Sequence, residues 1–134
     1  MQRTGITFSA FDLFHAGHVT MLKEAKQHCD YLIACLQTDP SLDRTTKSKP
    51  IQSVFERYVQ LAGCKYIDEI IPYTYESEVI DILLTYPIDV RIIGEEYKDK
   101  EFSGKEICIR KNIEIIYNDR KHSFSSTELR NRLA

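Results

Sequence analysis

The chain has 134 residues, the length of one ordinary domain, and residues 1–134 are predicted to form a single domain. Its 18 Lys and Arg against 20 Asp and Glu give a formal net charge of −2, which excludes the overall basic field that generic binding to nucleic acid or to an acidic membrane needs. The four cysteines form no C-x-x-C pair, which favours reduced thiols and a cytoplasmic location. No apolar stretch approaches the roughly 20 residues of a membrane span, so no anchor is expected.

Short apolar runs alternate with segments of helical spacing along the whole chain. The predicted strands are residues 6–11, 31–36, 66–71, 89–93 and 113–117. The predicted helices are residues 18–29, 53–63, 76–86, 103–112 and 125–134. This β-α-β-α order predicts an α/β fold, namely a Rossmann-like doubly wound sheet of five parallel strands. Ligands of such sheets bind beyond the carboxyl ends of the strands.

The turn after the first predicted strand carries the sequence FDLFHAGH at residues 11–18. It sets His15 and His18 three residues apart at a helix N-terminus, where unpaired amides and the helix dipole favour an anion. Gly17 allows a ligand to approach the backbone closely. Two other interpretations remain open: imidazoles satisfied by the backbone, or half of a zinc site that still needs a third ligand.

A long polar loop with two prolines, residues 38–50, separates a predicted strand from a predicted helix and is typical of a lid. Lys47 and Lys49 alternate on it. In an extended conformation both ammonium groups would project to the same side about 6 to 7 Å apart, a spacing that suits a polyphosphate. The alternative is an ordinary solvated loop.

A second candidate anion site lies at the start of the last predicted helix. Ser125 and Glu128 have the spacing of a capping box, which explains those two residues. It does not explain Arg120, Ser126 and Thr127, a guanidinium and hydroxyl donors at a helix N-terminus. With the histidine turn, they predict a site for a triphosphate. No nucleophile motif is present, and direct in-line attack of a substrate phosphate needs none, because positioning and charge stabilisation carry it.

These segments resemble the cytidylyltransferase family of small nucleotidyltransferases, most of all the glycerol-3-phosphate cytidylyltransferases. The H-x-G-H sequence at residues 15–18 matches the first signature of that family, and FSST at residues 124–127 matches its second, usually I-S-T-T. Residues 66–72 resemble its third strand. The sequence GEEY at residues 94–97 stands where the family has an acidic-aromatic G-D-D-W turn.

The resemblance implies transfer of CMP from CTP to a small phosphorylated alcohol, with Mg²⁺ on the triphosphate, release of pyrophosphate, and a homodimer. No metal ligand is assigned to protein side chains. The catalytic residues that it implies are His15, His18, Lys47 and Arg120. The nucleotide- and phosphate-binding residues are Ser9, Ala10, Phe11, Gly17, Lys49, Gly94, Glu96, Ser125, Ser126 and Thr127. The acceptor-binding candidates are Asp12, Asp39 and Lys65.

Two alternatives stand beside this interpretation. Residues 94–106 also resemble the heptose-phosphate adenylyltransferases, which share both signatures and imply ATP and a sugar phosphate as substrates. A nucleotide-binding module without turnover is the alternative from another class, and the intact histidine pair argues against it.

Overall fold

The computed structural model describes residues 2–119 and 126–133. Within them, five parallel strands form one sheet in the order β3-β2-β1-β4-β5. The chain winds outward from β1 to β3, then returns to the other side of β1 through β4 and β5, which confirms the predicted doubly wound sheet. The strands are β1 (Thr4–Ser9), β2 (Tyr31–Gln37), β3 (Glu69–Tyr73), β4 (Val90–Gly94) and β5 (Glu114–Asn118).

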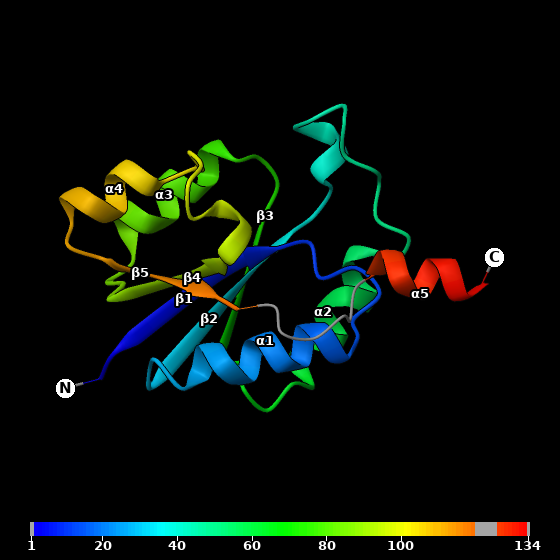
Figure 1. Ribbon diagram of the computed structural model, residues 1–134, viewed down its shortest axis with the longest axis horizontal. Helices are drawn as coiled ribbons and strands as arrows, with labels where there is room; N and C mark the ends of the chain where they lie inside the picture. The colour runs from blue at the N-terminus through cyan, green and yellow to red at the C-terminus, as the bar shows by residue number, and fades with distance from the viewer. Residues whose placement is uncertain (1, 120–125, 134) are drawn as a thin grey trace.

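Helices cover both faces of this sheet. Figure 1 shows α1 and α2 on one face, α3 and α4 on the other, and α5 beside the α1 and α2 layer near the C-terminus. Two 3-10 turns follow strand ends, η1 (Pro40–Leu42) after β2 and η2 (Glu95–Tyr97) after β4. The helices are α1 (Ala16–Lys26), α2 (Val54–Ala62), α3 (Ser77–Thr85), α4 (Lys105–Arg110) and α5 (Ser126–Leu133).

The two faces have separate hydrophobic cores. Val79 and Leu83 of α3 and Cys108 of α4 pack against one face. Leu22 of α1 and Leu61 of α2 pack against the other, in the cluster that we call the α1/α2 core and that also contains the apolar residues of the turn after β1. Residues of β4 and β5 that alternate along each strand therefore point to different cores.

Two strand boundaries differ from the prediction. We expected the first strand to reach residue 11, but β1 ends at Ser9 because the backbone turns at Phe11, whose φ is +51°. The third strand begins at Glu69 rather than at residue 66. The residue before it, Asp68, uses its carboxylate to accept a hydrogen bond from the amide of Leu32 at 2.8 Å, which fixes where pairing with β2 starts.

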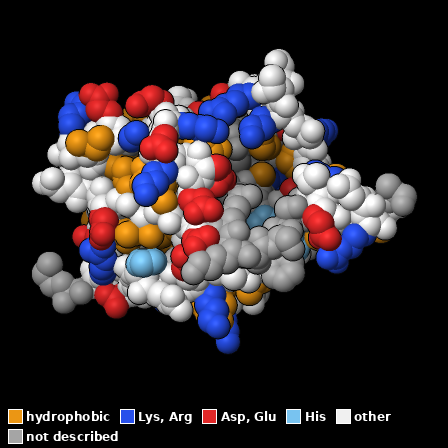
Figure 2. Space-filling view, in the orientation of Figure 1, with side chains coloured by type: hydrophobic (Ala, Val, Ile, Leu, Met, Phe, Trp, Pro, Cys, Tyr) orange, Lys and Arg blue, Asp and Glu red, His pale blue; other side chains and the backbone are white. Residues whose placement is uncertain are grey.

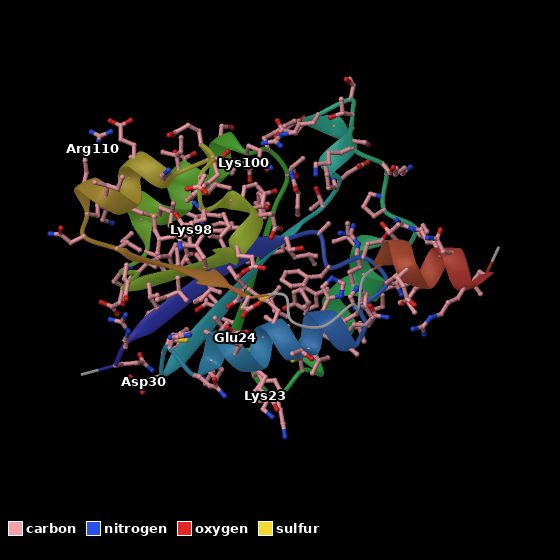
Figure 3. All side chains as sticks on the ribbon, viewed as in Figure 1. Lys23, Glu24, Asp30, Lys98, Lys100 and Arg110 are labelled. Carbon is pink, nitrogen blue, oxygen red and sulfur yellow. The ribbon has the colours of Figure 1, made fainter. Side chains whose placement is uncertain are left out.

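The labelled charged side chains of Figure 3, among them Lys23 and Glu24 on α1 and Arg110 on α4, lie on the outer surfaces of the helical layers. In the described part of the chain, no helix has the length and apolar character that crossing a membrane requires.

Candidate active site

The two histidines lie at the carboxyl end of β1, where α1 begins. His15 is the N-cap of α1, and its Nδ1 accepts a hydrogen bond from the amide of Gly17 at 2.9 Å. Nδ1 of His18 accepts one from the amide of His15 at 3.2 Å. The two imidazoles therefore act as a capping box and satisfy amides that the first helical turn would otherwise leave unpaired.

This capping also defines the tautomer of both rings. A nitrogen that accepts a hydrogen bond carries no proton, so in each neutral imidazole the proton lies on Nε2. The ring of His18 stacks on Phe14, with centroids 5.4 Å apart and planes 2° apart, and the rings of His15 and His18 are 4.0 Å apart. The backbone thus fixes both side chains, and their Nε2–H groups are suited to donate to an anion. The alternative interpretation, in which the backbone satisfies the imidazoles, is therefore confirmed for the Nδ1 atom of each ring.

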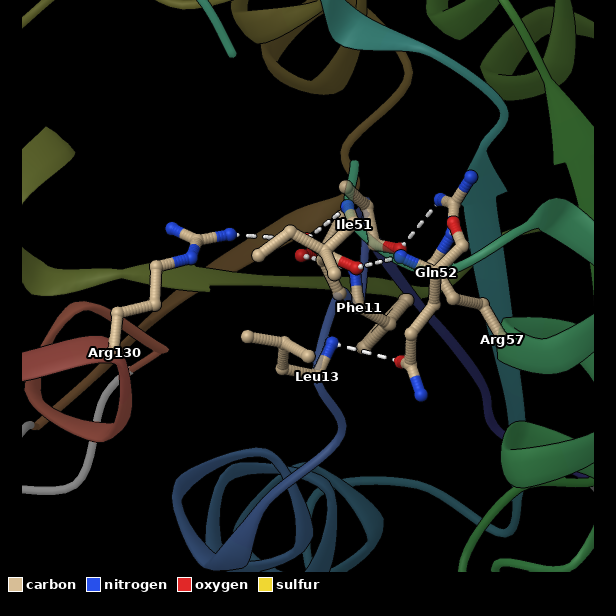
Figure 4. Close-up of polar contacts among 9 residues, drawn as sticks. Phe11, Leu13, Ile51, Gln52, Arg57 and Arg130 are labelled. Atoms are coloured by element: carbon tan, nitrogen blue, oxygen red, sulfur yellow. Dashed lines mark hydrogen bonds and ion pairs between the residues drawn. The ribbon is translucent and has the colours of Figure 1, made fainter. Parts of the chain in front are cut away.

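The turn that precedes the histidines has an uncommon backbone. Phe11 and Leu13 both have φ of +51°, in the left-handed region that residues other than glycine rarely adopt. The amide of Leu13 donates to Oε1 of Gln52 at 2.9 Å, and the carboxylate of Asp12 accepts from the amides of Ile51 and Gln52 at 2.9 and 3.0 Å (Figure 4). The segment before α2 therefore holds this strained turn in place.

Asp12 also joins α5 to the turn. Its Oδ2 pairs with Nη2 of Arg130 at 3.0 Å, while the Asp12 side chain is only 11% exposed (Figure 4). We predicted Asp12 as an acceptor-binding residue. That role stays a prediction, and the structure shows that its carboxylate joins three segments, the histidine turn, the segment before α2, and α5.

Arg57 of α2 is a site residue that the sequence analysis did not identify. It is 1% exposed, and its charge is surrounded by backbone rather than by solvent. Burial lowers the pKa of its guanidinium, and the carboxylates of Asp12 and Asp39 oppose that effect. Its guanidinium donates to the carbonyl oxygens of Ala10, Gln37, Thr38 and Gln52. One side chain thereby ties together the carboxyl ends of β1 and β2 and the segment before α2.

The predicted lid begins at the carboxyl end of β2 and is anchored there. Asp39 caps η1, its Oδ1 accepting from the amide and the hydroxyl of Ser41 at 3.0 and 2.6 Å. The carboxylate of Asp43 accepts from the amide of Glu76 at 3.0 Å. Asp39 therefore lies at the same sheet edge as the histidines, with its carboxylate used for the turn.

Lys47 and Lys49 are exposed on the rest of this loop. The amide of Lys47 donates to the carbonyl of Arg44 at 3.0 Å, so Lys47 ends a turn instead of continuing the extended run that we assumed. Neither ammonium group has a hydrogen bond or ion pair with a described residue. The chain then reaches Ile51, two residues after Lys49, and joins the histidine turn.

At the neighbouring strand end, Gly94 closes β4. A Cβ at Gly94 would lie 2.4 Å from Oε2 of Glu96, so the carboxylate of Glu96 occupies the place where a side chain would begin. Ser9 ends β1 and Ala10 follows it, and the Oγ of Ser9 accepts from the amide of Phe11 at 3.3 Å. The structure thus brings these four predicted residues to the same edge as the histidines.

Lys65 does not belong to this group. It precedes β3, and in a parallel sheet the residues before a strand lie at the opposite edge from those after one. Its ammonium lies over the ring of Tyr66, 5.3 Å from the centroid. Lys65 therefore lies apart from the residues gathered at the histidine edge, and its role as an acceptor ligand stays a prediction.

The second predicted signature falls partly outside the described residues, which do not include Arg120 and Ser125. Ser126 and Thr127 form the start of α5, with Thr127 exposed. Within the described ranges, no group of three or more His, Cys, Asp and Glu side chains could hold a metal ion. All four cysteines are free thiols.

The doubly wound sheet and the paired imidazoles at the carboxyl end of its central strand define a nucleotidyltransferase with a Rossmann-like fold. Figure 2, in the orientation of Figure 1, shows a histidine side chain in a hollow of the surface, with acidic side chains close by. A family model, "Cytidylyltransferase-like", matches residues 6–132, and the chain belongs to this family.

Similar proteins agree with this assignment. The chain is 30% identical over 129 residues to a glycerol-3-phosphate cytidylyltransferase of Bacillus subtilis (strain 168), covering 96% of this chain and 95% of the relative. It is 36% identical over 120 residues to a probable ethanolamine-phosphate cytidylyltransferase of Encephalitozoon cuniculi, covering 88% of this chain and 35% of that protein. Among solved structures, a lipopolysaccharide core biosynthesis protein from Thermoplasma volcanium has the same fold, with a TM-score of 0.72 at 22% identity over 89% of this chain and 98% of that one.

Proposed function

We propose that this protein transfers CMP from CTP to glycerol 3-phosphate or a similar small polyol phosphate, and releases pyrophosphate. Membership of the cytidylyltransferase-like family supports the reaction type. The proposed acceptor rests on full-length similarity to proteins described as glycerol-3-phosphate cytidylyltransferases. A cytoplasmic location, where CTP and phosphorylated alcohols occur, is part of the same proposal.

In the proposed reaction, an oxygen of the acceptor phosphate attacks the α-phosphorus of CTP. A new P–O bond forms, the bond from the α-phosphorus to the bridging oxygen breaks, and that oxygen leaves with pyrophosphate. Negative charge on the equatorial oxygens grows in the pentacoordinate transition state. Donors fixed in advance stabilise such charge most, because they need no reorganisation during the step.

The observation that carries the proposal is the pairing of both Nδ1 atoms with backbone amides. It directs a proton to Nε2 of His15 and of His18, two donors only one helical turn apart, at the positive end of α1. Neutral imidazoles with this tautomer can donate to a phosphate without losing a proton. That role requires no covalent intermediate, which agrees with the lack of a nucleophile motif.

The remaining proposed contacts hold the triphosphate. The start of α5, with Thr127, and the exposed lysines of the loop before α2 are proposed to supply donors and positive charge, and Ser126 is included from the resemblance alone. Arg120 and Ser125 are proposed for the same role from the resemblance alone. Phe11 and Gly17 are proposed to border the phosphates, since both are buried in the histidine turn.

Mg²⁺ is proposed to enter with the nucleotide. Mg²⁺ in such sites takes most of its ligands from phosphate oxygens and water, with one or two carboxylates at most. When bound, the ion neutralises part of the triphosphate charge.

ATP with a sugar phosphate is the second candidate pair of substrates. Residues 94–106 favour it, because GEEY stands there in place of the G-D-D-W turn of the cytidylyltransferases and because the whole segment resembles the adenylyltransferases.

Pyrophosphate release tests both candidates. The purified protein with Mg²⁺ is given CTP or ATP and, separately, glycerol 3-phosphate or a panel of polyol and sugar phosphates. We expect release with CTP and a polyol phosphate. Release with ATP alone would assign the second pair of substrates, and no release with any combination would contradict turnover.

Variants connect that activity to the histidine turn. His18→Ala is expected to lower kcat about 10- to 1000-fold, because one transition-state donor contributes on the order of 3 kcal/mol. Affinity for the nucleotide should change much less. His28→Ala, at the other end of α1, is the matched control and should retain the parent rate. Equal rates for His18→Ala and the parent would refute the assigned role.

A further inference from the structure

Asn118, the last residue of β5, combines burial with unpaired polar atoms. It is 3% exposed, and neither its Oδ1 nor its Nδ2 has a hydrogen-bond partner among the described residues. Buried amide groups in folded proteins are nearly always paired, since an unpaired one loses its bonds to water without replacement. An apolar side chain of the same size would avoid that loss, so the amide needs another explanation.

The register of the sheet places Asn118 at the candidate site. It is the partner of Gly94 at the carboxyl ends of β4 and β5. Ile116, two residues earlier on the same strand, packs in the α1/α2 core together with Phe11 and Phe14. Side chains two residues apart share a face of a sheet, so Asn118 lies on the face that carries the histidine turn.

A carboxylate lies on the same face of the next strand. Val90 and Ile92 of β4 belong to the α1/α2 core, so the missing side chain of Gly94 would point to that face, and the carboxylate of Glu96 lies where it would begin. Neighbouring strands are about 4.8 Å apart. The Asn118 amide and the Glu96 carboxylate are therefore adjacent groups at the end of β4 and β5.

The two ends of this edge differ in the charge that they favour. The start of α1 at the end of β1 attracts anions, whereas the end of β5 presents the buried, uncharged amide of Asn118. The end of β4 and β5 therefore suits a neutral part of the ligand that forms hydrogen bonds. In a nucleotide this part is the nucleoside, and an amide, with one acceptor and one donor side by side, matches the hydrogen-bonding edge of a base.

We propose that Asn118 is a specificity-determining residue whose amide hydrogen-bonds the base of the bound nucleotide. The inference rests on the proposed function, because it requires a nucleotide whose phosphates lie at the histidine turn. Oδ1 would accept from the exocyclic amino group of cytosine, and Nδ2 would donate to the adjacent ring nitrogen. Adenine presents the same pair of groups, so the residue serves either candidate nucleotide.

Calorimetric titration of the purified protein, with Mg²⁺, tests this contact. The probes are CTP, ATP and inorganic tripolyphosphate, which has no base. Asn118→Leu is expected to weaken CTP binding at least tenfold and to leave tripolyphosphate binding within twofold of the parent. Its melting temperature should be equal to or higher than that of the parent, because the unpaired amide is removed. Asn118→Asp, which keeps the shape and loses the donor, should weaken CTP binding in the same direction.

Gln60 of α2 provides a matched control, since its Oε1 is also buried without a partner among the described residues. Gln60→Met should leave both affinities unchanged. Parent-like CTP binding by both Asn118 variants, or equal weakening of CTP and tripolyphosphate, would overturn the role of Asn118 while the proposed function stands. A parent protein that binds neither CTP nor ATP would overturn the proposed function and this inference with it.

Discussion

Replacing Arg57 with methionine tests how the site is held together. Methionine keeps much of the apolar volume and removes the guanidinium that donates to four carbonyl oxygens of the described residues. Hydrogen bonds from charged groups contribute about 1.5–3 kcal/mol each, so the gross loss is about 6–12 kcal/mol. Burying the charge costs free energy in the parent, and this term offsets part of the loss.

The net effect is set by the carbonyl oxygens that remain. Removing one member of a buried charged network typically costs about 3–5 kcal/mol, and we expect Arg57→Met to fall in this range. A domain of this size is stabilised by about 5–15 kcal/mol in total. Arg57→Lys keeps the charge but cannot reach all the acceptors with one ammonium, so it should recover part of the stability.

Urea denaturation followed by circular dichroism measures this change. Arg110→Met is the control, because Arg110 is 65% exposed and pairs with Glu106 one turn away on α4, so we expect a change within about 0.5 kcal/mol. If Arg57→Met loses no more stability than Arg110→Met, the carbonyl network does not hold the strand ends, and our account of the site geometry is refuted. A Lys variant that is stable but has a lowered kcat would show that the network also sets the spacing of the site.

Three further predictions concern other parts of the molecule. Lys47→Ala should raise KM for the nucleotide and lower kcat, because the loop supplies charge to bound phosphates; unchanged kinetics would leave Lys47 as a solvated side chain. Phe55→Asp should abolish dimerisation in sedimentation experiments, since Phe55 is 75% exposed on α2, and a monomeric parent would refute the expected homodimer. Burial acts to raise the pKa of Asp68, but hydrogen bonds from Lys26 and from the amide of Leu32 lower it overall. Asp68→Asn should therefore cost about 1 kcal/mol of unfolding free energy at pH 7. The loss should shrink as the pH falls below 3.8, because the parent carboxylate then becomes protonated, and urea denaturation at pH 7 and below pH 3.8 measures the difference.

Features that depend on local sequence could be predicted well. The periodicity of apolar residues predicted each strand and helix of the described chain to within a few residues, and the order of elements predicted the doubly wound sheet. The position of His15 and His18 followed from neighbouring residues alone, since a strand, a turn and a helix start within about ten residues of them. Their capping role needed no long-range contact.

Features that depend on tertiary contacts could not be predicted. Arg57 is one charged residue in an amphipathic helix, and its spacing does not reveal that it is 1% exposed. Asp12 lies next to the histidines in sequence, but its partners Ile51 and Arg130 are 39 and 118 residues away. Lys65 was named from a resemblance in sequence, which does not show that it precedes β3 and lies apart from the strand ends that carry the histidines.

The junction at Asp12 explains why a strained turn can carry the proposed catalytic pair, His15 and His18. Two left-handed residues destabilise the turn by a few kcal/mol in total, at about 1–3 kcal/mol each, so contacts from outside must compensate. These contacts come from the amides of residues 51 and 52 and from the guanidinium of Arg130. Residues 51 and 52 end the loop that carries Lys47 and Lys49, and Arg130 follows the second signature, so both segments border the site. Any shift of α5 or of this loop therefore changes the support of the histidine turn. The proposed binding of phosphates by those two segments and the alignment of the imidazoles are consequently coupled through one carboxylate.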